Sequence, residues 1–230
     1  KVAATQPTVP AYPDMAAASQ DQLLQYLASQ REVWRVNAQC ELLKRGSSTA
    51  LVTALTPPAM HTGALYVRGA ALFTLAQLEG EKAHGTLATL ASLPELREYA
   101  LRALADRDDQ VWGVNTDLFV QGLKDPNPRV RVQAAIGLGR LQKPALAAAL
   151  PPLTADADPM VRQAAMQALR RLAARDVCLA AMKDTAHPDI ITGDMRTLLS
   201  FHDPAVLPAV SEVYKTGKTP ALRKEARSRW

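Results

Sequence analysis

Histidine and cysteine side chains are the residues of this sequence whose chemistry would most readily support catalysis or metal binding. The histidines are His61, His84, His187 and His202. Neither they nor the two cysteines, Cys40 and Cys178, fall in the His-x-x-His, His-Glu-x-x-His or Cys-x-x-Cys-His spacings that bind zinc or attach haem. We therefore predict no metal site, and we interpret both cysteines as small residues of the core.

Acidic and glycine-rich stretches also lack the context that chemistry would need. Asp106, Asp108 and Asp109 lie together between predicted helices, where helix capping and solubility explain them better than cation binding does. Gly137 and Gly139 lie inside a helical pattern with no strand before them, so they do not form a phosphate-binding loop. The sequence predicts no catalytic residue, no cofactor-binding residue and no cofactor.

A sequence segment that occurs twice predicts the helices that would position any functional site. The segment that begins at Asp125 and ends at Leu141 is echoed, 31 residues later, by the segment from Asp156 to Leu172. Both copies place Pro three residues before an Arg, Val directly before it, Ala three after it, and Leu seven and ten after it. Repetition with a period of this length is typical of a solenoid.

Each copy carries a signal for the start of a helix. Asn127 and Asp158 precede prolines at the first helical position, where the missing N–H has no cost. An apolar stripe with helical spacing follows in the first copy. This stripe consists of Val130, Ala134, Leu138 and Leu141. The unit is therefore a pair of helices whose second helix begins at the Pro.

The same register extends over most of the chain. Pro recurs at positions 94, 128, 159, 188 and 220, and two earlier copies keep the Arg without the Pro. We count seven helix pairs. The sixth is the least regular, because Ile191 takes the place of the Arg and Asp194 the place of the Ala.

The pattern Asp-x-x-Pro-x-Val-Arg-x-x-Ala-x-x-x-Leu-x-x-Leu resembles the HEAT repeat, particularly the short HEAT-like variety of phycobilin lyases. The resemblance covers about residues 20–230 and implies an all-α fold, a right-handed α-solenoid of about seven HEAT-like helix pairs. In that family the turn Asp and the second-helix Arg pair along the stack. By resemblance, Asp125 with Arg131 and Asp156 with Arg162 would form a structural ladder.

Composition agrees with closely packed helices and limits the partners. The 230 residues are 48% hydrophobic and only 5% aromatic. The formal charge is +5, and 22 acidic residues are interspersed among 27 basic ones, without the like-charge blocks of a nucleic-acid arm. We expect nucleic acid to be an unlikely partner, and no apolar run is long enough to span a membrane.

The chain divides into a linker and a repeat domain. Residues 1–18 carry three prolines and no helical period, so we predict an extended Pro-rich linker there. Residues 19–230 are the predicted HEAT-like repeat domain. Because the chain stops at Trp230 without a polar capping repeat, we expect it to be one segment of a longer polypeptide.

Stacking of the second helices would align equivalent exposed positions into rows on the concave face, and these rows are the candidate binding surface. One row lies nine residues after the repeat Arg, and a second row lies two residues after it. The candidates from both rows are Asn37, Lys44, Gln77, Tyr99, Gln133, Arg140 and Arg171. The rows are mixed in charge, unlike a groove that must neutralise successive phosphates.

The leading hypothesis is a non-catalytic scaffold that binds a protein partner or neighbouring domains of the same chain. Two alternatives stay open. One is a protein that acts on a prosthetic group, as bilin lyases do, and the other is a HEAT-like nucleic-acid binder. The segment from Val33 to Arg45 also resembles the HEAT part of large bacterial proteins that join a sugar-dehydrogenase-like propeller to a c-type cytochrome. That resemblance implies an extracytoplasmic location, which the residues themselves do not decide.

Overall fold

The computed structural model describes residues 11–60 and 63–227. Its contacts divide the chain into two compact units, residues 1–79 and residues 80–230. Every regular element in the described ranges is a helix, and no strand occurs in them, which confirms the all-α prediction. Whether residues 19–230 act as one domain stays a prediction, and each unit is described by itself.

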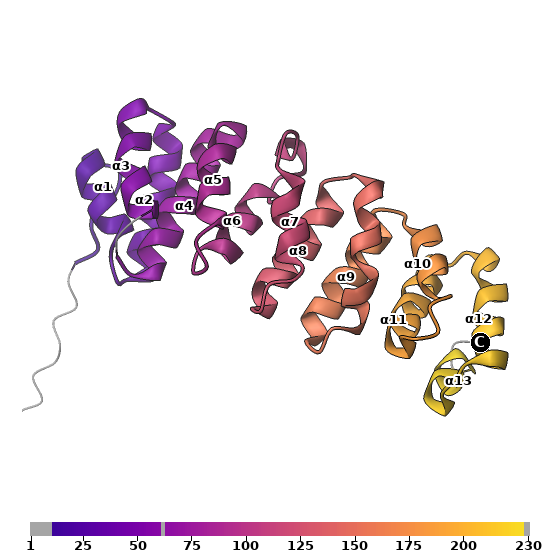
Figure 1. Ribbon diagram of the computed structural model, residues 1–230. Helices are drawn as coiled ribbons and strands as arrows, with labels where there is room; N and C mark the ends of the chain where they lie inside the picture. The colour runs from indigo at the N-terminus through magenta and orange to yellow at the C-terminus, as the bar shows by residue number, and fades with distance from the viewer. Residues whose placement is uncertain (1–10, 61–62, 228–230) are drawn as a thin grey trace, which may run out of the picture. The chain divides into compact units, whose positions relative to one another are not determined.

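Unit 1 contains two helix pairs (Figure 1). The first helix of each pair packs on the second, and the two second helices pack on one another. Ser19 caps the first helix in a reciprocal arrangement with Gln22, as a capping box requires. The helices are α1 (Gln20–Leu27), α2 (Glu32–Arg45), α3 (Thr49–Met60) and α4 (Leu65–Glu79).

Part of the predicted linker is held against unit 1. Met15 and Ala18 are buried, and the guanidinium of Arg45 donates to the carbonyl oxygens of Met15, Ala16 and Ala18 at 3.2, 3.0 and 2.8 Å. Residues 11–18 are therefore tied to the end of α2. The first ten residues of the predicted linker, and Trp230 at the other end, lie outside the described residues.

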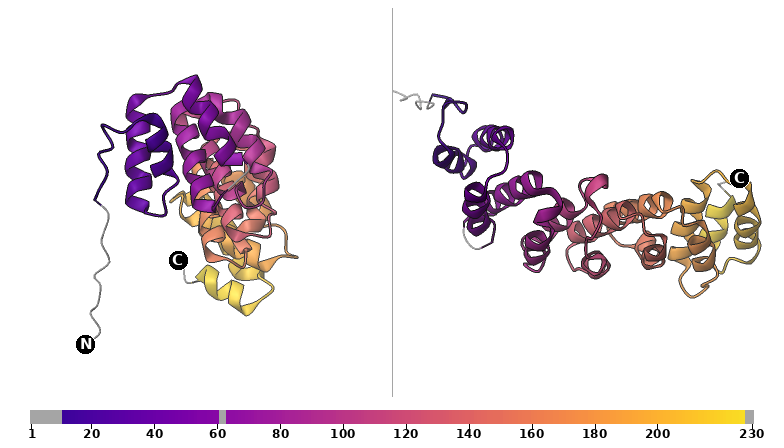
Figure 2. Two further views of the ribbon diagram at one scale, coloured as in Figure 1. Left: turned by 90° about the vertical axis from the view of Figure 1, so that its left-hand side faces the viewer. Right: turned by 90° about the horizontal axis from the view of Figure 1, so that it is seen from above.

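Unit 2 contains five helix pairs, which with the two of unit 1 make the seven predicted pairs within the described residues. Its second helices pack in chain order, α6 on α8, α8 on α9, α9 on α11 and α11 on α13, as the further views in Figure 2 also show. The α-helices are α5 (His84–Ala91), α6 (Arg97–Leu104), α7 (Thr116–Gly122), α8 (Pro128–Arg140), α9 (Pro159–Arg171), α10 (Arg175–Ala181), α11 (Pro188–Leu199), α12 (Leu207–Thr216) and α13 (Pro220–Arg227). The 3₁₀ helices are η1 (Gly80–Ala83), η2 (Asp108–Gln110), η3 (Pro144–Ala149), η4 (Pro151–Ala155) and η5 (Pro204–Val206).

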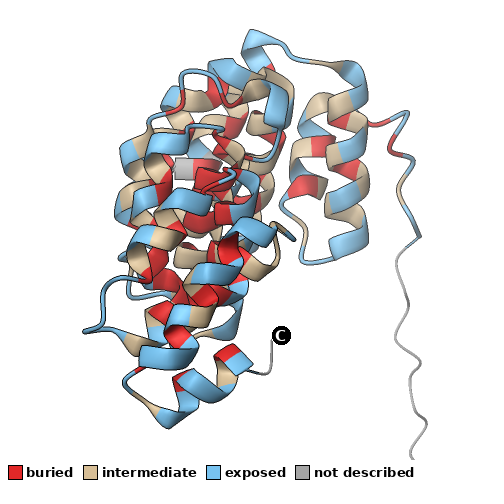
Figure 3. Cartoon of the chain, turned by 90° about the vertical axis from the view of Figure 1, so that its right-hand side faces the viewer, coloured by how far each residue is buried: buried red, intermediate tan, exposed pale blue. Residues whose placement is uncertain are grey.

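The central helices begin and pack as their residues predict. Asn127 accepts from the N–H of Arg129 at 3.0 Å, and Asp158 accepts from the N–H of Met160 at 2.7 Å. The stripe from Val130 to Leu141 is buried, and Figure 3 shows buried residues concentrated between paired helices. Burial of this stripe removes apolar surface from water, which is the main stabilising term of such a stack.

Proline has different effects on the local structure of the second and the fifth pair. The first element of the fifth pair is two 3₁₀ segments, η3 and η4, each of which starts at a proline. Proline cannot donate to an α-helical hydrogen bond, so these short segments take the tighter turn. In the second pair, Pro57 and Pro58 do not end α3, which continues through both prolines to Met60.

Two helical glycines allow unusually close packing in unit 2. A β-carbon on Gly137 would overlap the ring of Phe119, which lies on the first helix of the same pair. A β-carbon on Gly193 would lie 2.6 Å from the carbonyl oxygen of Thr154, which belongs to η4 of the preceding pair. The first contact involves a side chain, whereas the second also involves backbone.

Candidate functional site

A ladder of arginine and aspartate side chains joins the central pairs of unit 2. Arg97 pairs with Asp125 at 2.5 Å. Arg131 donates two hydrogen bonds of 2.8 Å, one to each carboxylate oxygen of Asp156. Such a bidentate pair is stronger and more directional than a single contact. Each rung therefore fixes the orientation of one pair relative to the next.

The predicted pairing of the ladder is wrong in its partners, although its four residues all take part. Arg131 reaches Asp125 through the backbone carbonyl, at 2.9 Å, and Arg162 reaches the carbonyl of Asp156 at 2.7 Å. The carboxylate of each Asp faces the arginine of the preceding pair instead. The reason is geometric. One guanidinium nitrogen of Arg131 donates to the turn that precedes its own helix, and the other two nitrogens point to Asp156 of the next pair.

The rung between Arg131 and Asp156 is also an electrostatic unit. Burial alone would raise the pKa of Asp156, but hydrogen bonds from Arg131 and from the N–H of Asp158 outweigh it and hold the pKa below its ordinary value. The hydrogen bonds to Asp156 raise the pKa of Arg131. Both groups are charged at neutral pH, and their pairing offsets the cost of partial burial.

The ladder does not continue unchanged. In unit 1, the guanidinium of Arg35 stacks over the ring of Tyr66 at 4.7 Å, which is a cation–π contact in place of an ion pair. In unit 2, Arg162 makes no ion pair with a carboxylate of the described residues. Thr185 stands at the Asp position of the sixth pair and Ile191 at its Arg position, so the series of rungs ends there.

In the first predicted row of binding residues, the members in unit 1 are exposed, whereas the arginines in unit 2 are bonded to other parts of the fold. Lys44 and Gln77 are exposed in unit 1. In unit 2, Arg140 donates to the carbonyl oxygen of Ala105 at 2.8 Å, and Arg171 pairs with Asp108. Both arginines hold the loop of residues 105–109, so they have a structural role that the sequence did not predict.

The second predicted row is less accessible than expected. Asn37 is half-buried and donates to the carbonyl oxygen of Val33, one turn earlier, at 2.7 Å. Tyr99 and Gln133 are half-buried as well. Their binding role stays a prediction.

Exposed apolar side chains on α2 and α4 were not predicted as a surface. Val33 is 61% exposed, Val36 49% and Tyr66 39%. Cys40 is exposed too, so the prediction that it is a core residue is wrong. Positions 33, 36, 37, 40 and 44 share one face of α2 by helical spacing. This face therefore combines apolar side chains with the predicted residues Asn37 and Lys44.

The irregular sixth pair contains a buried acid beside a thiol. Asp194 and Cys178 are both fully buried, which confirms the core prediction for Cys178. Neither carboxylate oxygen of Asp194 has a hydrogen-bond partner of normal geometry among the described residues. Burial raises the pKa of Asp194 to about 7, and the nearby thiol of Cys178 only partly offsets this. Burial, with the charge of Asp194, raises the pKa of Cys178 to about 12.

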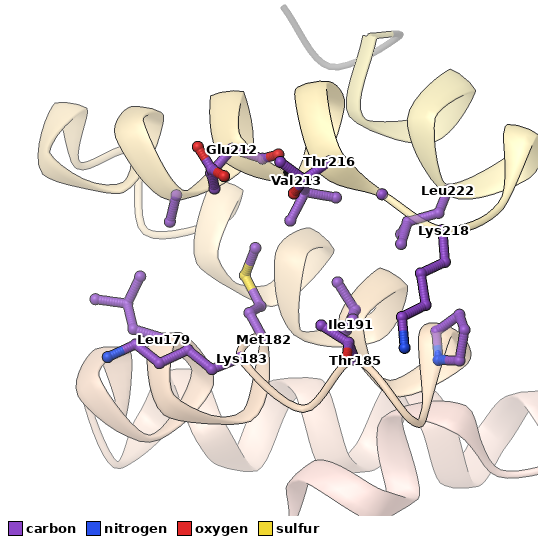
Figure 4. Close-up of a pocket in the computed structure, with 13 residues that line it drawn as sticks. Leu179, Met182, Lys183, Thr185, Ile191, Glu212, Val213, Thr216, Lys218 and Leu222 are labelled. Carbon is purple, nitrogen blue, oxygen red and sulfur yellow. Dashed lines mark hydrogen bonds between the residues drawn. The ribbon is translucent and has the colours of Figure 1, made fainter.

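A pocket of about 570 Å³ opens between the sixth and seventh pairs (Figure 4). α10 forms one wall and α12 the opposite wall, and α11 and α13 contribute residues between them. Most of its lining is apolar. The principal apolar residues are Leu179, Met182, Ile191, Val213 and Leu222.

Two lysines and one glutamate provide the charge at this pocket. Lys183 lies at the end near Leu179, and Lys218 lies at the other end near Leu222 (Figure 4). Glu212 belongs to the α12 wall. No ion pair joins Lys183 or Lys218 to another described residue. No sequence signal singled out this pocket, because its residues come from four different elements.

Within residues 11–60 and 63–227, no group of three His, Cys, Asp or Glu side chains is placed to hold a metal ion. None of the described helices combines the length and apolar character that crossing a membrane would require.

Comparison with protein families decides the nature of the repeats. The family model for HEAT repeats matches residues 85–170 and 116–189. Over these residues the chain is similar to HEAT repeats. The resemblance to HEAT-like proteins is thereby confirmed, and the match spans the regular HEAT pairs as well as the start of the irregular sixth pair. A search of curated proteins finds no match.

One solved structure has a similar fold over nearly the whole chain. The YibA protein of Escherichia coli is 17% identical, with 94% of this chain and 93% of that chain covered and a TM-score of 0.51. This likeness concerns the fold alone.

Two further structures are more distant. A HEAT-like repeat protein of Thermococcus onnurineus NA1 is 12% identical, with coverage of 92% and 95% and a TM-score of 0.45. The complex of CpcE and CpcF, of the phycocyanin lyase of Nostoc sp. PCC7120, is 20% identical, with coverage of 97% and 100% and a TM-score of 0.35. At these TM-scores neither carries an argument about function. None of the comparisons supports the resemblance to dehydrogenase–cytochrome proteins.

Proposed function

We propose that this chain is a non-catalytic scaffold that binds a protein partner through the exposed face of α2. The observation that carries the proposal is the set of exposed apolar side chains there, Val33 and Val36, with Tyr66 on the neighbouring helix α4. Apolar side chains that gather on a surface are typical of protein interfaces. Asn37 and Lys44 on the same face supply polar contacts around them.

The arginines of the ladder and of the first predicted row favour a protein partner over a nucleic acid. Binding to a duplex needs free Lys or Arg side chains to contact successive phosphates. Arg140 and Arg171 instead hold the loop of residues 105–109, and Arg97 and Arg131 belong to the ladder. These guanidinium groups are already used within the fold.

The test is capture of the chain from its source, with the co-captured proteins identified by mass spectrometry. We expect a protein partner whose capture is lost when Val33 and Val36 are both changed to Asp. Met160→Asp is the matched control, because Met160 is an equally exposed apolar residue (64%) outside this surface. No co-captured protein, or capture that the Val33→Asp and Val36→Asp changes leave intact, would contradict the proposal. The intact mass of the captured chain tests the prediction that it is one segment of a larger protein.

A further inference from the structure

The apolar pocket between α10 and α12 has no role in the ladder or in the packing described above. α12 packs on α13 and η5, α10 packs on α11, and α11 packs on α13, so the two walls are joined through α11 and α13. Leu179 and Met182 on one wall face Val213 on the other, with Ile191 and Leu222 between them (Figure 4). A volume of about 570 Å³ is in the range that holds a bound ligand group, and an apolar occupant would remove this lining from water.

Two of the three charged side chains that line the pocket are positive, and Asp184, next to Lys183, is the nearby acid, whose pKa is lowered by a hydrogen bond with His187 and by the charge of Lys218. Lys183 and Lys218 extend from its two ends, and neither makes an ion pair with a described residue. Between residues 207 and 227 the chain has five Lys or Arg residues and two Glu residues. One of those two, Glu225, already pairs with Arg196 at 2.7 Å. The two lysines therefore attract negatively charged groups at the two ends of the pocket.

We infer that this pocket receives a large apolar side chain from an acidic peptide segment of the protein partner. The inference rests on the proposed scaffold function and gives the chemistry of its partner at a second contact. The arrangement of the lysines favours a peptide. Because they lie at opposite ends, a single carboxylate cannot engage both, whereas acidic residues on either side of one apolar side chain can. Glu212 disfavours a carboxylate against the α12 wall.

The experiment is selection of a phage-displayed library of random peptides on the immobilised full chain, followed by affinity measurement of the selected peptides. We expect selected peptides to combine Leu, Phe or Trp with Asp or Glu. The double change Lys183→Glu and Lys218→Glu should weaken their binding at least about tenfold. Ala209→Phe, which fills the pocket from the α12 wall, should have a similar effect while circular dichroism stays unchanged.

The matched control is the double change Lys124→Glu and Lys143→Glu. These lysines are exposed, lie outside the pocket and make no ion pair with a described residue, so the control alters the net charge equally and should leave binding unchanged. Selected peptides without acidic enrichment, peptides that bind the pocket variants as well as the wild type, or no selected peptides would each overturn the inference. Equal displacement of the peptides by dodecanoate would also overturn it, because the site would then accept any anionic amphiphile.

The two proposals fail separately. The library experiment uses the isolated chain and does not involve Val33 or Val36. A partner that is captured through α2, but whose binding survives the pocket variants, would contradict only the inference about the pocket.

Discussion

The fourth and fifth helix pairs of the chain and the sixth pair, all in unit 2, solve the same packing problem in different ways. In the regular pairs, a bidentate rung between Arg131 and Asp156 joins neighbours, and small Ala134 faces the first helix. In the sixth pair the ladder arginine is replaced by Ile191, and the small residue is replaced by the buried acid Asp194. The difference teaches that a HEAT stack can keep its geometry after the Arg–Asp ladder ends, because closer backbone packing joins the sixth pair to the fifth and the ion pair of Arg196 with Glu225 joins it to the seventh. Gly193 against Thr154 supplies that closer packing.

The largest expected effect comes from filling this close contact. Gly193→Ala places a methyl group against the side chain and backbone carbonyl of Thr154, so we expect a loss of about 3 kcal/mol in the free energy of unfolding. Gly137→Ala meets only the Phe119 ring and should cost less. Denaturant titration measures both. Gly85→Ala is the control, because nothing lies within 4 Å of its β-carbon position. If Gly193→Ala costs no more than Gly137→Ala, the backbone contact is not what supports the sixth pair.

The next effect tests the ladder. Arg131→Ala removes two bonds to Asp156 and leaves a half-buried carboxylate without its partner, so we expect a loss of about 2 kcal/mol. Arg162→Ala removes bonds to its own turn only and should cost about 1 kcal/mol. Thermal and denaturant unfolding of both variants give the comparison. Equal losses would mean that the rung adds nothing between pairs.

The helix pairs could be predicted from the sequence, but the partners of the ladder could not. The spacing of Pro128 and Pro159 predicted the helix pairs, because proline and its preceding cap act locally. The partner of Arg131 was predicted wrongly, since the direction in which a guanidinium folds depends on the neighbouring pair. The pocket was not predicted at all, because Lys183 and Lys218 are brought together only by the packing of separate helices. Asp194 had a signal, namely its place in the repeat register, although its burial required the structure.

A smaller effect, opposite in sign, is expected at Asp194. Its pKa of about 7 in the folded protein lies above the ordinary value of 3.8, so the folded state holds the proton between these values more often than the unfolded state. The protonated form of Asp194 therefore makes its whole contribution to the stability of the fold below about pH 4, and this contribution is lost as the pH rises through 7. Asp194→Ala should stabilise the protein by about 1–3 kcal/mol at pH 8 and by less at pH 5. A gain that does not depend on pH would show that packing, and not ionisation, is responsible.

The smallest effect on stability is expected for Cys40→Ser, within about 0.5 kcal/mol, because the side chain is exposed. In that variant Cys178 is the remaining thiol. With a pKa of about 12 and full burial, it should react with a thiol reagent at neutral pH only when α10 and α11 separate. Gly193→Ala in the same background should accelerate the labelling. Immediate labelling of Cys178 in the native state would contradict its place in the core.

The direction of the ladder has a consequence for assembly. In both Arg–Asp rungs of the ladder, the earlier pair supplies the guanidinium and the later pair supplies the acid, whereas the more exposed ion pair of Arg129 with Glu98 runs the other way. The ladder therefore has chemical polarity, with a donor end and an acceptor end. Modules of this type can be joined head to tail with every rung satisfied, whereas a head-to-head junction would set two arginines or two aspartates against one another.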